Sequence, residues 1–233
     1  MCTVILWRGA GQCALAANRD ERLGRAWEAP GPYWPGIVGG RDATAGGTWM
    51  AMNAAGVVAA VLNRPGTLGP APGKRSRGEL PLIALRGADA GEAAQRIAAL
   101  PAGEWRPFNM VIADAGRAFF LAGLGAGSPA ASELGEGVSM VTAHPPNDLT
   151  SPRTTRHLPR FRAAPPPRPG DWGAWPGLLA DSGGGTEEAL NVPPLGGFGT
   201  VCASLIMLAP AGREWRFAPG PPDRTPFAAV ALP

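Results

Sequence analysis

The second residue of the chain could act as a nucleophile. Removal of Met1 is expected when residue two is small, and it would leave a thiol and a free α-amine together on Cys2. An α-amine ordinarily has a pKa of about 7.7–8.0, which makes it a suitable base for a thiol whose pKa is ordinarily about 8.5. Such a nucleophile needs no separate histidine, which fits a chain with only 2 histidines. The alternative interpretation is a Met-Cys start without chemical meaning.

A run of four polar residues, Asn18-Arg19-Asp20-Glu21, follows the second apolar segment of the chain. The short apolar runs 3–7 and 13–18, separated by a glycine-rich turn, predict a β-hairpin. That hairpin would bring the polar run across from Cys2. Charged side chains are costly to bury unless they are paired. We therefore predict a site that contains Cys2 and this tetrad, with a solvated turn as the alternative.

The rest of the chain predicts the elements that must position these residues. Strands are expected at 37–39, 48–53, 57–63, 108–113, 117–122, 138–143, 200–208, 214–217 and 227–232. Helices are expected after the capping-box pattern Ser76-Arg77-Gly78-Glu79, after Asp89, from Ser151-Pro152 to about Phe161, and within 172–181. The Gly/Pro-rich segment 64–75 is expected to be a loop. This order favours an α+β fold with antiparallel sheets.

Composition excludes several classes of function. The chain has 233 residues, 45% hydrophobic and 17% charged, with a net charge of +3, which indicates a globular protein without a nucleic-acid-binding motif. No apolar run approaches the roughly 18 residues of a membrane span, and the start does not resemble a signal peptide, so we expect a cytoplasmic protein. Three cysteines without a CxxC pair and two histidines predict no metal site, and Cys13 and Cys202 are expected to be small buried residues.

Several motifs together resemble the NRDE family, also called the transport and Golgi organisation 2 family. They are Met1-Cys2, the tetrad, the stretch from Gly39-Gly40-Arg41-Asp42 to Gly46-Gly47-Thr48-Trp49, Ser76-Arg77-Gly78-Glu79 and Phe108-Asn109-Met110-Val111. The resemblance implies one domain over residues 1–233 with an N-terminal-nucleophile hydrolase-like fold. That fold is a four-layer αββα sandwich of two antiparallel sheets.

A more distant resemblance, to choloylglycine hydrolases and penicillin V acylases, implies roles for single residues. By it Asp20 would hold the α-amine and Asn63 would donate to an oxyanion, the alternative for Asn63 being a turn cap before Pro65. Those hydrolases carry an arginine where this chain has Ala17, and Arg19 is the candidate substitute. The predicted catalytic group is Cys2, Asn18, Arg19, Asp20 and Asn63, and the candidate substrate-binding residues are Glu21, Arg41, Trp49 and Arg77.

Two functions remain open from the sequence. The first is hydrolysis of a linear amide or thioester by Cys2. The second is non-catalytic binding and trafficking of a small haem- or lipid-related molecule, which the resemblance suggests, with arginines pairing the carboxylates of haem. In both cases the partner is a small molecule. His144, His157 and the arginines of 153–162 are expected to be structural or solvated, although that helix could also receive a carboxylate or phosphate. The sequence carries no signal of oligomeric state.

Overall fold

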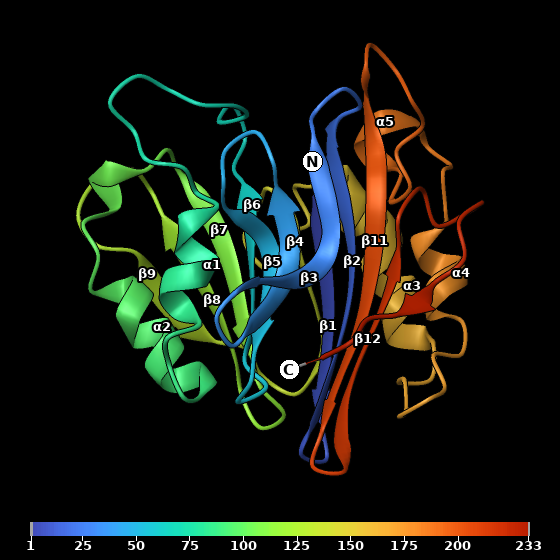
Figure 1. Ribbon diagram of the computed structural model, residues 1–233. Helices are drawn as coiled ribbons and strands as arrows, with labels where there is room; N and C mark the ends of the chain where they lie inside the picture. The colour runs from blue at the N-terminus through green and yellow to red at the C-terminus, as the bar shows by residue number, and fades with distance from the viewer. Residues whose placement is uncertain (1, 233) are drawn as a thin grey trace. The chain divides into compact units, whose positions relative to one another are not determined.

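The computed structural model describes residues 2–232, which form two compact units, each built on an antiparallel sheet (Figure 1). The first unit comprises the chain up to Arg25 together with Glu136–Ala231, and the second comprises Ala26–Gly135. Two large antiparallel sheets with few helices confirm the predicted α+β class.

The sheet of the first unit contains both predicted parts of the site. Its strand order is β10-β1-β2-β11-β12-β13. The predicted hairpin is confirmed, since Thr3 pairs with Asn18 at one end and Gly9 with Gln12 at the turn. The bounds are β1 (Thr3–Gly9), β2 (Gln12–Arg22), β10 (Gly137–Val141), β11 (Phe198–Ala209), β12 (Gly212–Ala218) and β13 (Ala228–Ala229).

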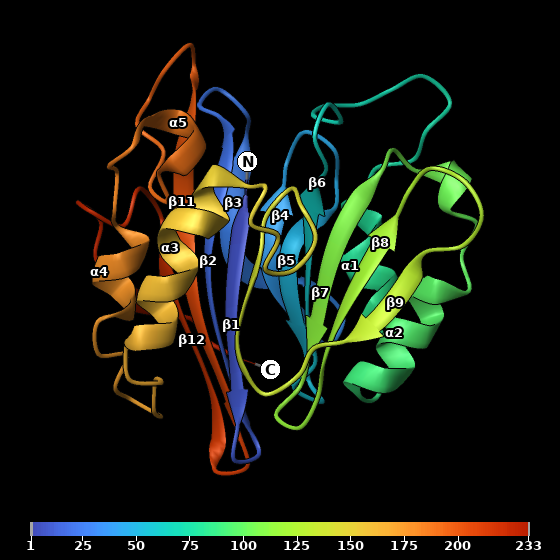
Figure 2. The same ribbon diagram turned by 180° about the vertical axis from the view of Figure 1, so that it is seen from behind.

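One face of this sheet is covered by helices α3 (Pro152–Ala163) and α4 (Trp175–Leu179), as Figure 2 shows. The short α5 (Gly185–Glu188) follows. The predicted start of α3 is confirmed, because the Ser151 side chain accepts a hydrogen bond from the Thr154 amide. Alternate residues of the strands point to these helices and form a core with them. Its members include Ile5, Ala14, Ala16, Met140, Leu158, Phe161, Trp175, Leu205 and Met207.

The second unit is a seven-stranded meander in which the spatial order of the strands follows the chain. Its strands are β3 (Trp27–Trp34), β4 (Ile37–Asp42), β5 (Thr48–Asn53), β6 (Val58–Asn63), β7 (Phe108–Ala113), β8 (Ala118–Gly123) and β9 (Ala130–Glu133). β3 and β9 were not expected from the sequence. β3 is interrupted by proline and glycine, and all four residues of β9 are exposed, so neither shows an apolar pattern.

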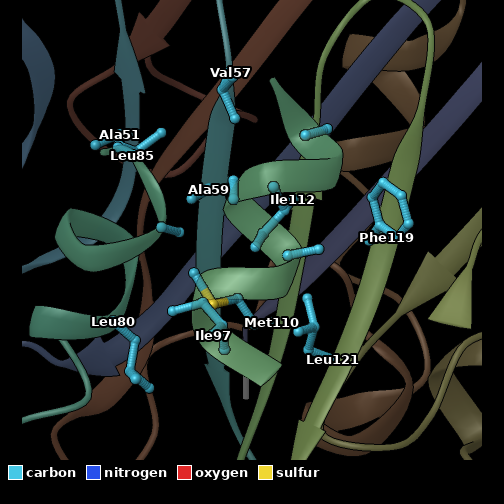
Figure 3. Packing of buried hydrophobic residues seen from close by; sticks show 14 of the residues in the cluster. Ala51, Val57, Ala59, Leu80, Leu85, Ile97, Met110, Ile112, Phe119 and Leu121 are labelled. Carbon is cyan, nitrogen blue, oxygen red and sulfur yellow. The ribbon is translucent and has the colours of Figure 1, made fainter. Parts of the chain in front are cut away.

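Helices α1 (Glu79–Ala84) and α2 (Ala90–Ala98) and the 3-10 turn η1 (Ala102–Glu104) complete this unit. Figure 3 shows the apolar core that packs Leu80 and Ile97 of the helices with Met110, Ile112 and Leu121 of the strands. Asp89 caps α2 by accepting from the Glu92 amide, as predicted.

The predicted capping box at Ser76 is wrong. The helix begins at Glu79 with Gly78 as its N-cap and no side-chain cap. The carboxylate of Glu79 is instead bound by the guanidinium of Arg75, and the Ser76 hydroxyl accepts from the Gly78 amide at 3.2 Å. The competing ion pair therefore replaces the capping contact.

The segment 64–75 is a loop without helix or strand, as predicted, and arginine side chains hold it in shape. Arg106 donates to the main-chain oxygens of four loop residues, which are Gly66, Leu68, Gly69 and Pro70, at 2.8–3.2 Å. Because a guanidinium carries five N–H donors in a fixed plane, one side chain satisfies several loop carbonyls. The loop directly follows Asn63.

Two of the sequence motifs meet in the second unit. The Thr48 amide donates to the Gly78 main-chain oxygen at 2.9 Å, so the segment around Gly47 contacts the start of α1. A Cβ atom placed on Gly47 would lie 2.4 Å from the carbonyl carbon of Gly78. Both motifs therefore contain glycine because the two backbones touch.

Candidate active site

Cys2 lies directly before β1 and beside the polar tetrad. The thiol Sγ donates to the main-chain oxygen of Asp20 at 3.6 Å. The pairing of Thr3 with Asn18, continued by one residue, sets Cys2 opposite Arg19 on β2. The predicted proximity of Cys2 to the tetrad is therefore seen in the structure.

The environment of Cys2 favours the protonated thiol. Burial raises the pKa of Cys2, and the negative charge of Asp20 raises it further. The hydrogen bond to the Asp20 main chain and the charge of Arg19 act in the opposite direction and do not overcome this. Because the thiolate is the reactive form, the thiol needs a base at neutral pH.

Asp20 is buried and both of its carboxylate oxygens have a donor. Oδ2 accepts from Nη1 of Arg153 at 2.9 Å, and Oδ1 accepts from the hydroxyl of Thr200 at 2.7 Å. The Asp20 side chain is 0% exposed and that of Arg153 is 3% exposed. A buried carboxylate is tolerated when a cation and hydrogen bonds replace water. The side chain is thus fixed in one orientation.

Arg153 comes from the first turn of α3 and has further partners. Its Nη1 also donates to the Thr3 hydroxyl at 3.0 Å, and its Nη2 donates to the Thr186 main-chain oxygen at 3.2 Å. The expectation of a solvated arginine face on this helix is wrong for Arg153, since the period of the helix places it on the buried stripe with Leu158 and Phe161. Binding of an external carboxylate or phosphate by this helix stays a prediction, since the carboxylate that Arg153 contacts is that of Asp20.

Asn18 holds a second segment of the chain against β2. Its side-chain Nδ2 donates to the main-chain oxygens of Leu179 and Leu190 at 3.0 and 2.9 Å. Thr200 adds to this attachment, because its hydroxyl oxygen accepts from the Val192 amide at 2.7 Å. These contacts are structural, and a catalytic part for Asn18 stays a prediction.

Arg19 occupies the other face of β2 from Asp20, since side chains alternate along a strand. Its register partner on β11 is Cys202, and its Nη2 lies 3.8 Å from the carboxylate of Glu21. The charge of Arg19 acts to lower the pKa of both Cys2 and Cys202, although burial keeps the pKa of Cys202 well above its usual value. Cys13 and Cys202 are buried, as expected.

Asn63 belongs to the second unit, where it ends β6 opposite Phe108. The residue that follows it is anchored twice. Nη1 of Arg64 donates to the buried Asn109 side chain at 2.5 Å, and the Arg64 amide donates to the Thr67 hydroxyl at 3.0 Å. The backbone next to Asn63 is thus well determined, while its part in oxyanion binding stays a prediction.

The remaining candidate residues of the second unit have contacts within that unit. The Arg41 guanidinium donates to Glu28 and lies 4.8 Å from the centre of the Tyr33 ring. Arg77 donates to the Thr67 hydroxyl, to the Pro107 oxygen and to the Gly69 oxygen.

Trp49 packs edge-on against Trp27, with the ring centroids 5.8 Å apart. In the first unit, Glu21 lies 3.8 Å from Arg25 as well as from Arg19. Substrate binding by Glu21, Arg41, Trp49 and Arg77 is a prediction that these contacts leave open.

The two histidines have structural surroundings. Nε2 of His157 lies 2.9 Å from the Glu188 main-chain oxygen, and Nδ1 lies 3.2 Å from Nη1 of Arg160. Both ring nitrogens of His157 are therefore engaged. Nδ1 of His144 lies 3.6 Å from the carboxylate of Asp148. Among residues 2–232, no three His, Cys, Asp or Glu side chains gather as a metal-binding group, and no helix is long and apolar enough to cross a membrane.

Solved structures of low sequence identity share the fold of this chain. An N-acylethanolamine-hydrolyzing acid amidase ortholog from Caenorhabditis elegans matches with a TM-score of 0.58 and 11% identity, covering 88% of this chain and 92% of that one. A mutant of the conjugated bile acid hydrolase from Clostridium perfringens matches with a TM-score of 0.52 and 12% identity, covering 100% and 97%. Penicillin V acylase from Agrobacterium tumefaciens gives 0.50 and 14%, covering 94% and 83%.

These neighbours have the N-terminal-nucleophile hydrolase fold, so the predicted fold is confirmed. No curated protein matches the chain by sequence. A family model does match, over residues 1–153, and this range includes Cys2, the whole tetrad, Asn63 and Arg153. The chain belongs to the transport and Golgi organisation 2 family.

Proposed function

We propose that this protein is a cysteine N-terminal-nucleophile hydrolase that cleaves a linear amide or thioester after removal of Met1. The observation that carries the proposal is the buried carboxylate of Asp20, fixed through both oxygens, in the residue whose main-chain oxygen accepts from the Cys2 thiol. A buried carboxylate that is held in place destabilises the fold unless it is fully paired, and active sites are where such groups gather. Membership of the family and a fold shared with amidases and acylases support it.

The proposed reaction begins at the terminal residue. The α-amine of Cys2 takes the proton of the thiol, which burial and Asp20 otherwise keep in place. The thiolate attacks the substrate carbonyl carbon and forms a tetrahedral oxyanion. The C–N or C–S bond of the substrate then breaks, and the α-ammonium returns the proton to the departing amine or thiol. This leaves an acyl thioester on Cys2.

Water completes the cycle. The α-amine takes a proton from a water molecule, whose oxygen attacks the thioester carbonyl. Collapse of this second tetrahedral species breaks the C–S bond and releases a carboxylic acid, and the α-ammonium returns its proton to the sulfur, which restores the Cys2 thiol. The oxyanion of both steps needs hydrogen-bond donors, and Asn63 is the proposed side-chain donor. Loss of one such donor typically lowers kcat by about 100- to 1,000-fold, so Asn63→Ala is a direct probe.

The test measures the intact mass of the purified protein and then its covalent labelling at Cys2. We expect the purified protein to lack Met1 and to form a thioester adduct with a β-lactone acyl probe at Cys2. Cys2→Ala should abolish the adduct. Cys13→Ala is the control, because it removes a second free thiol of the same unit and should leave labelling intact. Retention of Met1, or an adduct that persists in Cys2→Ala, would refute the proposal.

A further inference from the structure

One nitrogen of Arg153 joins the carboxylate of Asp20 to the strand that begins directly after Cys2. Nη1 donates to Asp20 Oδ2 at 2.9 Å and to the Thr3 hydroxyl at 3.0 Å. Thr3 is bonded directly to Cys2 in the chain. The guanidinium therefore sets the distance between the candidate carboxylate and the main chain at the nucleophile, two groups that lie on neighbouring strands.

The other end of the guanidinium is anchored independently. Nη2 donates to the Thr186 main-chain oxygen at 3.2 Å, and this oxygen belongs to α5 rather than to the sheet. A planar fork with fixed donor directions can bridge three such acceptors, whereas a lysine ammonium is a single point on a flexible stem. The position thus uses the shape of arginine as well as its charge.

We propose that Arg153 is a positioning residue of the active site. It orients Asp20 toward the α-amine of the mature Cys2 and offsets the negative charge that Asp20 presents to the thiol. This inference rests on the proposed function. Arg153 contacts no reacting atom in this scheme and acts through Asp20 and Thr3.

The positive charge of Arg153 should affect the pH dependence of Cys2 labelling, which a role in packing alone would not change. Besides the α-amine of the mature Cys2 itself, the charged and titratable groups around the thiol are Asp20 and Arg19 of β2, Cys202 of β11 and, through Asp20, Arg153 of α3. The charge of Asp20 favours the protonated thiol. Without Arg153, this charge is no longer compensated, so thiolate formation should need a higher pH.

The experiment measures the second-order rate of Cys2 labelling by a β-lactone probe as a function of pH. We expect Arg153→Met to lower the maximal rate at least tenfold and to move the half-maximal pH upward. The double variant Arg153→Met with Asp20→Asn removes both charges, so it should return the half-maximal pH toward the wild-type value while the rate stays low. Arg162→Met is the control on the same helix, at an exposed arginine, and should match the wild type.

The outcomes separate the two proposals. If the wild-type protein labels at Cys2 while Arg153→Met keeps its rate and half-maximal pH, the positioning role is wrong and the proposed function stands. A rate loss that only follows the folded fraction, at an unchanged half-maximal pH, also overturns the positioning role. An unlabelled wild-type protein overturns both.

A conservative variant covers the case in which Arg153→Met does not fold. Arg153→Lys keeps the charge, so its half-maximal pH should stay near the wild-type value. Its rate should fall at least threefold, because one ammonium cannot bridge Thr3, Asp20 and Thr186 at once. A wild-type rate in the lysine variant would contradict the proposal.

Discussion

Arg153 and Asp20 form a buried ion pair, 2.9 Å between Nη1 and Oδ2, across 133 residues of sequence. The pair connects the first turn of α3 to the end of β2, so one interaction serves both the fold and the candidate site. Removing one partner of such a pair leaves an uncompensated buried charge and typically costs about 3–5 kcal/mol. Any change at Asp20 or Arg153 must therefore be interpreted together with a measurement of stability.

Thr200→Val tests the second donor to Asp20. The Thr200 hydroxyl donates to Oδ1 of Asp20 and accepts from the Val192 amide, and valine keeps the shape but removes both bonds. We expect the free energy of unfolding to fall by about 1–3 kcal/mol, the cost of leaving buried polar groups unsatisfied. Urea denaturation measures it. Thr44→Val, at an exposed turn position, is the control and should change stability little; an equal effect in both variants would contradict the assignment.

Asn18→Ala tests whether Asn18 is primarily structural. The side chain ties Leu179 and Leu190 to β2, so its loss should free the segment 179–192 from the sheet. We expect faster amide hydrogen exchange in that segment and a fall in unfolding free energy of about 1–3 kcal/mol. Cys2 labelling should fall only in proportion to the folded fraction. A tenfold loss of labelling in a fully folded Asn18→Ala would instead favour the catalytic role predicted from the sequence.

His157 gives the chain a defined sensitivity to acid. Burial lowers the pKa of His157 to about 4, against about 6.5 for an unperturbed histidine. The Glu188 carbonyl accepts from Nε2–H, and the Arg160 guanidinium donates to Nδ1, an arrangement that requires a neutral ring. The charges that act on His157 are those of Asp181, Arg160 and Arg156.

The direction in which the unfolding free energy changes with pH follows from which state binds the proton. Between pH 6.5 and about 4 the unfolded chain binds a proton at residue 157 that the folded chain excludes, so unfolding free energy falls as the pH falls through this window. Urea midpoints at pH 7 and pH 4.5 measure the fall. His157→Gln can keep both hydrogen bonds without titrating and should show a smaller fall. His144→Gln should keep the wild-type fall, and identical behaviour of the two variants would disprove the assignment.

The sequence was sufficient for the hairpin that carries the site. Two short apolar runs and a glycine-containing turn predicted β1 and β2, and the register of that hairpin places Cys2 beside the tetrad. The family motifs supplied what local patterns could not, namely the fold of the whole chain. The hairpin pattern is local in sequence, and the family resemblance depends on several short motifs at once. Both predictions, the hairpin and the fold, are confirmed.

The side chains that bind the Asp20 carboxylate could not be predicted from local sequence patterns. Arg153 and Thr200 lie 133 and 180 residues from Asp20, and no local pattern links side chains at such separations. A signal did exist for Arg153, because it shares the helical stripe of His157, Leu158 and Phe161. An arginine on an otherwise buried stripe needs a buried acceptor. The expectation of a solvated helix rested on its overall basic charge and not on the position of each arginine around the helix axis, so the burial of Arg153 was not predicted.

The contact between Gly47 and Gly78 supports a ranked prediction. A Cβ on Gly47 would lie 2.4–2.7 Å from the backbone of Gly78, whereas a Cβ on Gly78 would lie 3.1 Å from the nearest atom of the Gly47 segment. Backbone cannot rotate away as a side chain can, so Gly47→Ala must separate the two segments and stretch the bond from the Thr48 amide to the Gly78 oxygen. We expect Gly47→Ala to lower unfolding free energy by about 1–3 kcal/mol or more, the usual cost of overpacking.

Gly78→Ala should cost less than Gly47→Ala, because a shift of a few tenths of an ångström relieves its contacts. Gly135→Ala is the control, since an added Cβ there would meet no atom of residues 2–232 within 4 Å. Thermal unfolding of the three variants gives the order directly. If Gly78→Ala proved the more damaging, the conformational needs of the α1 N-cap, rather than the close approach of two backbones, would explain why glycine stands in both motifs.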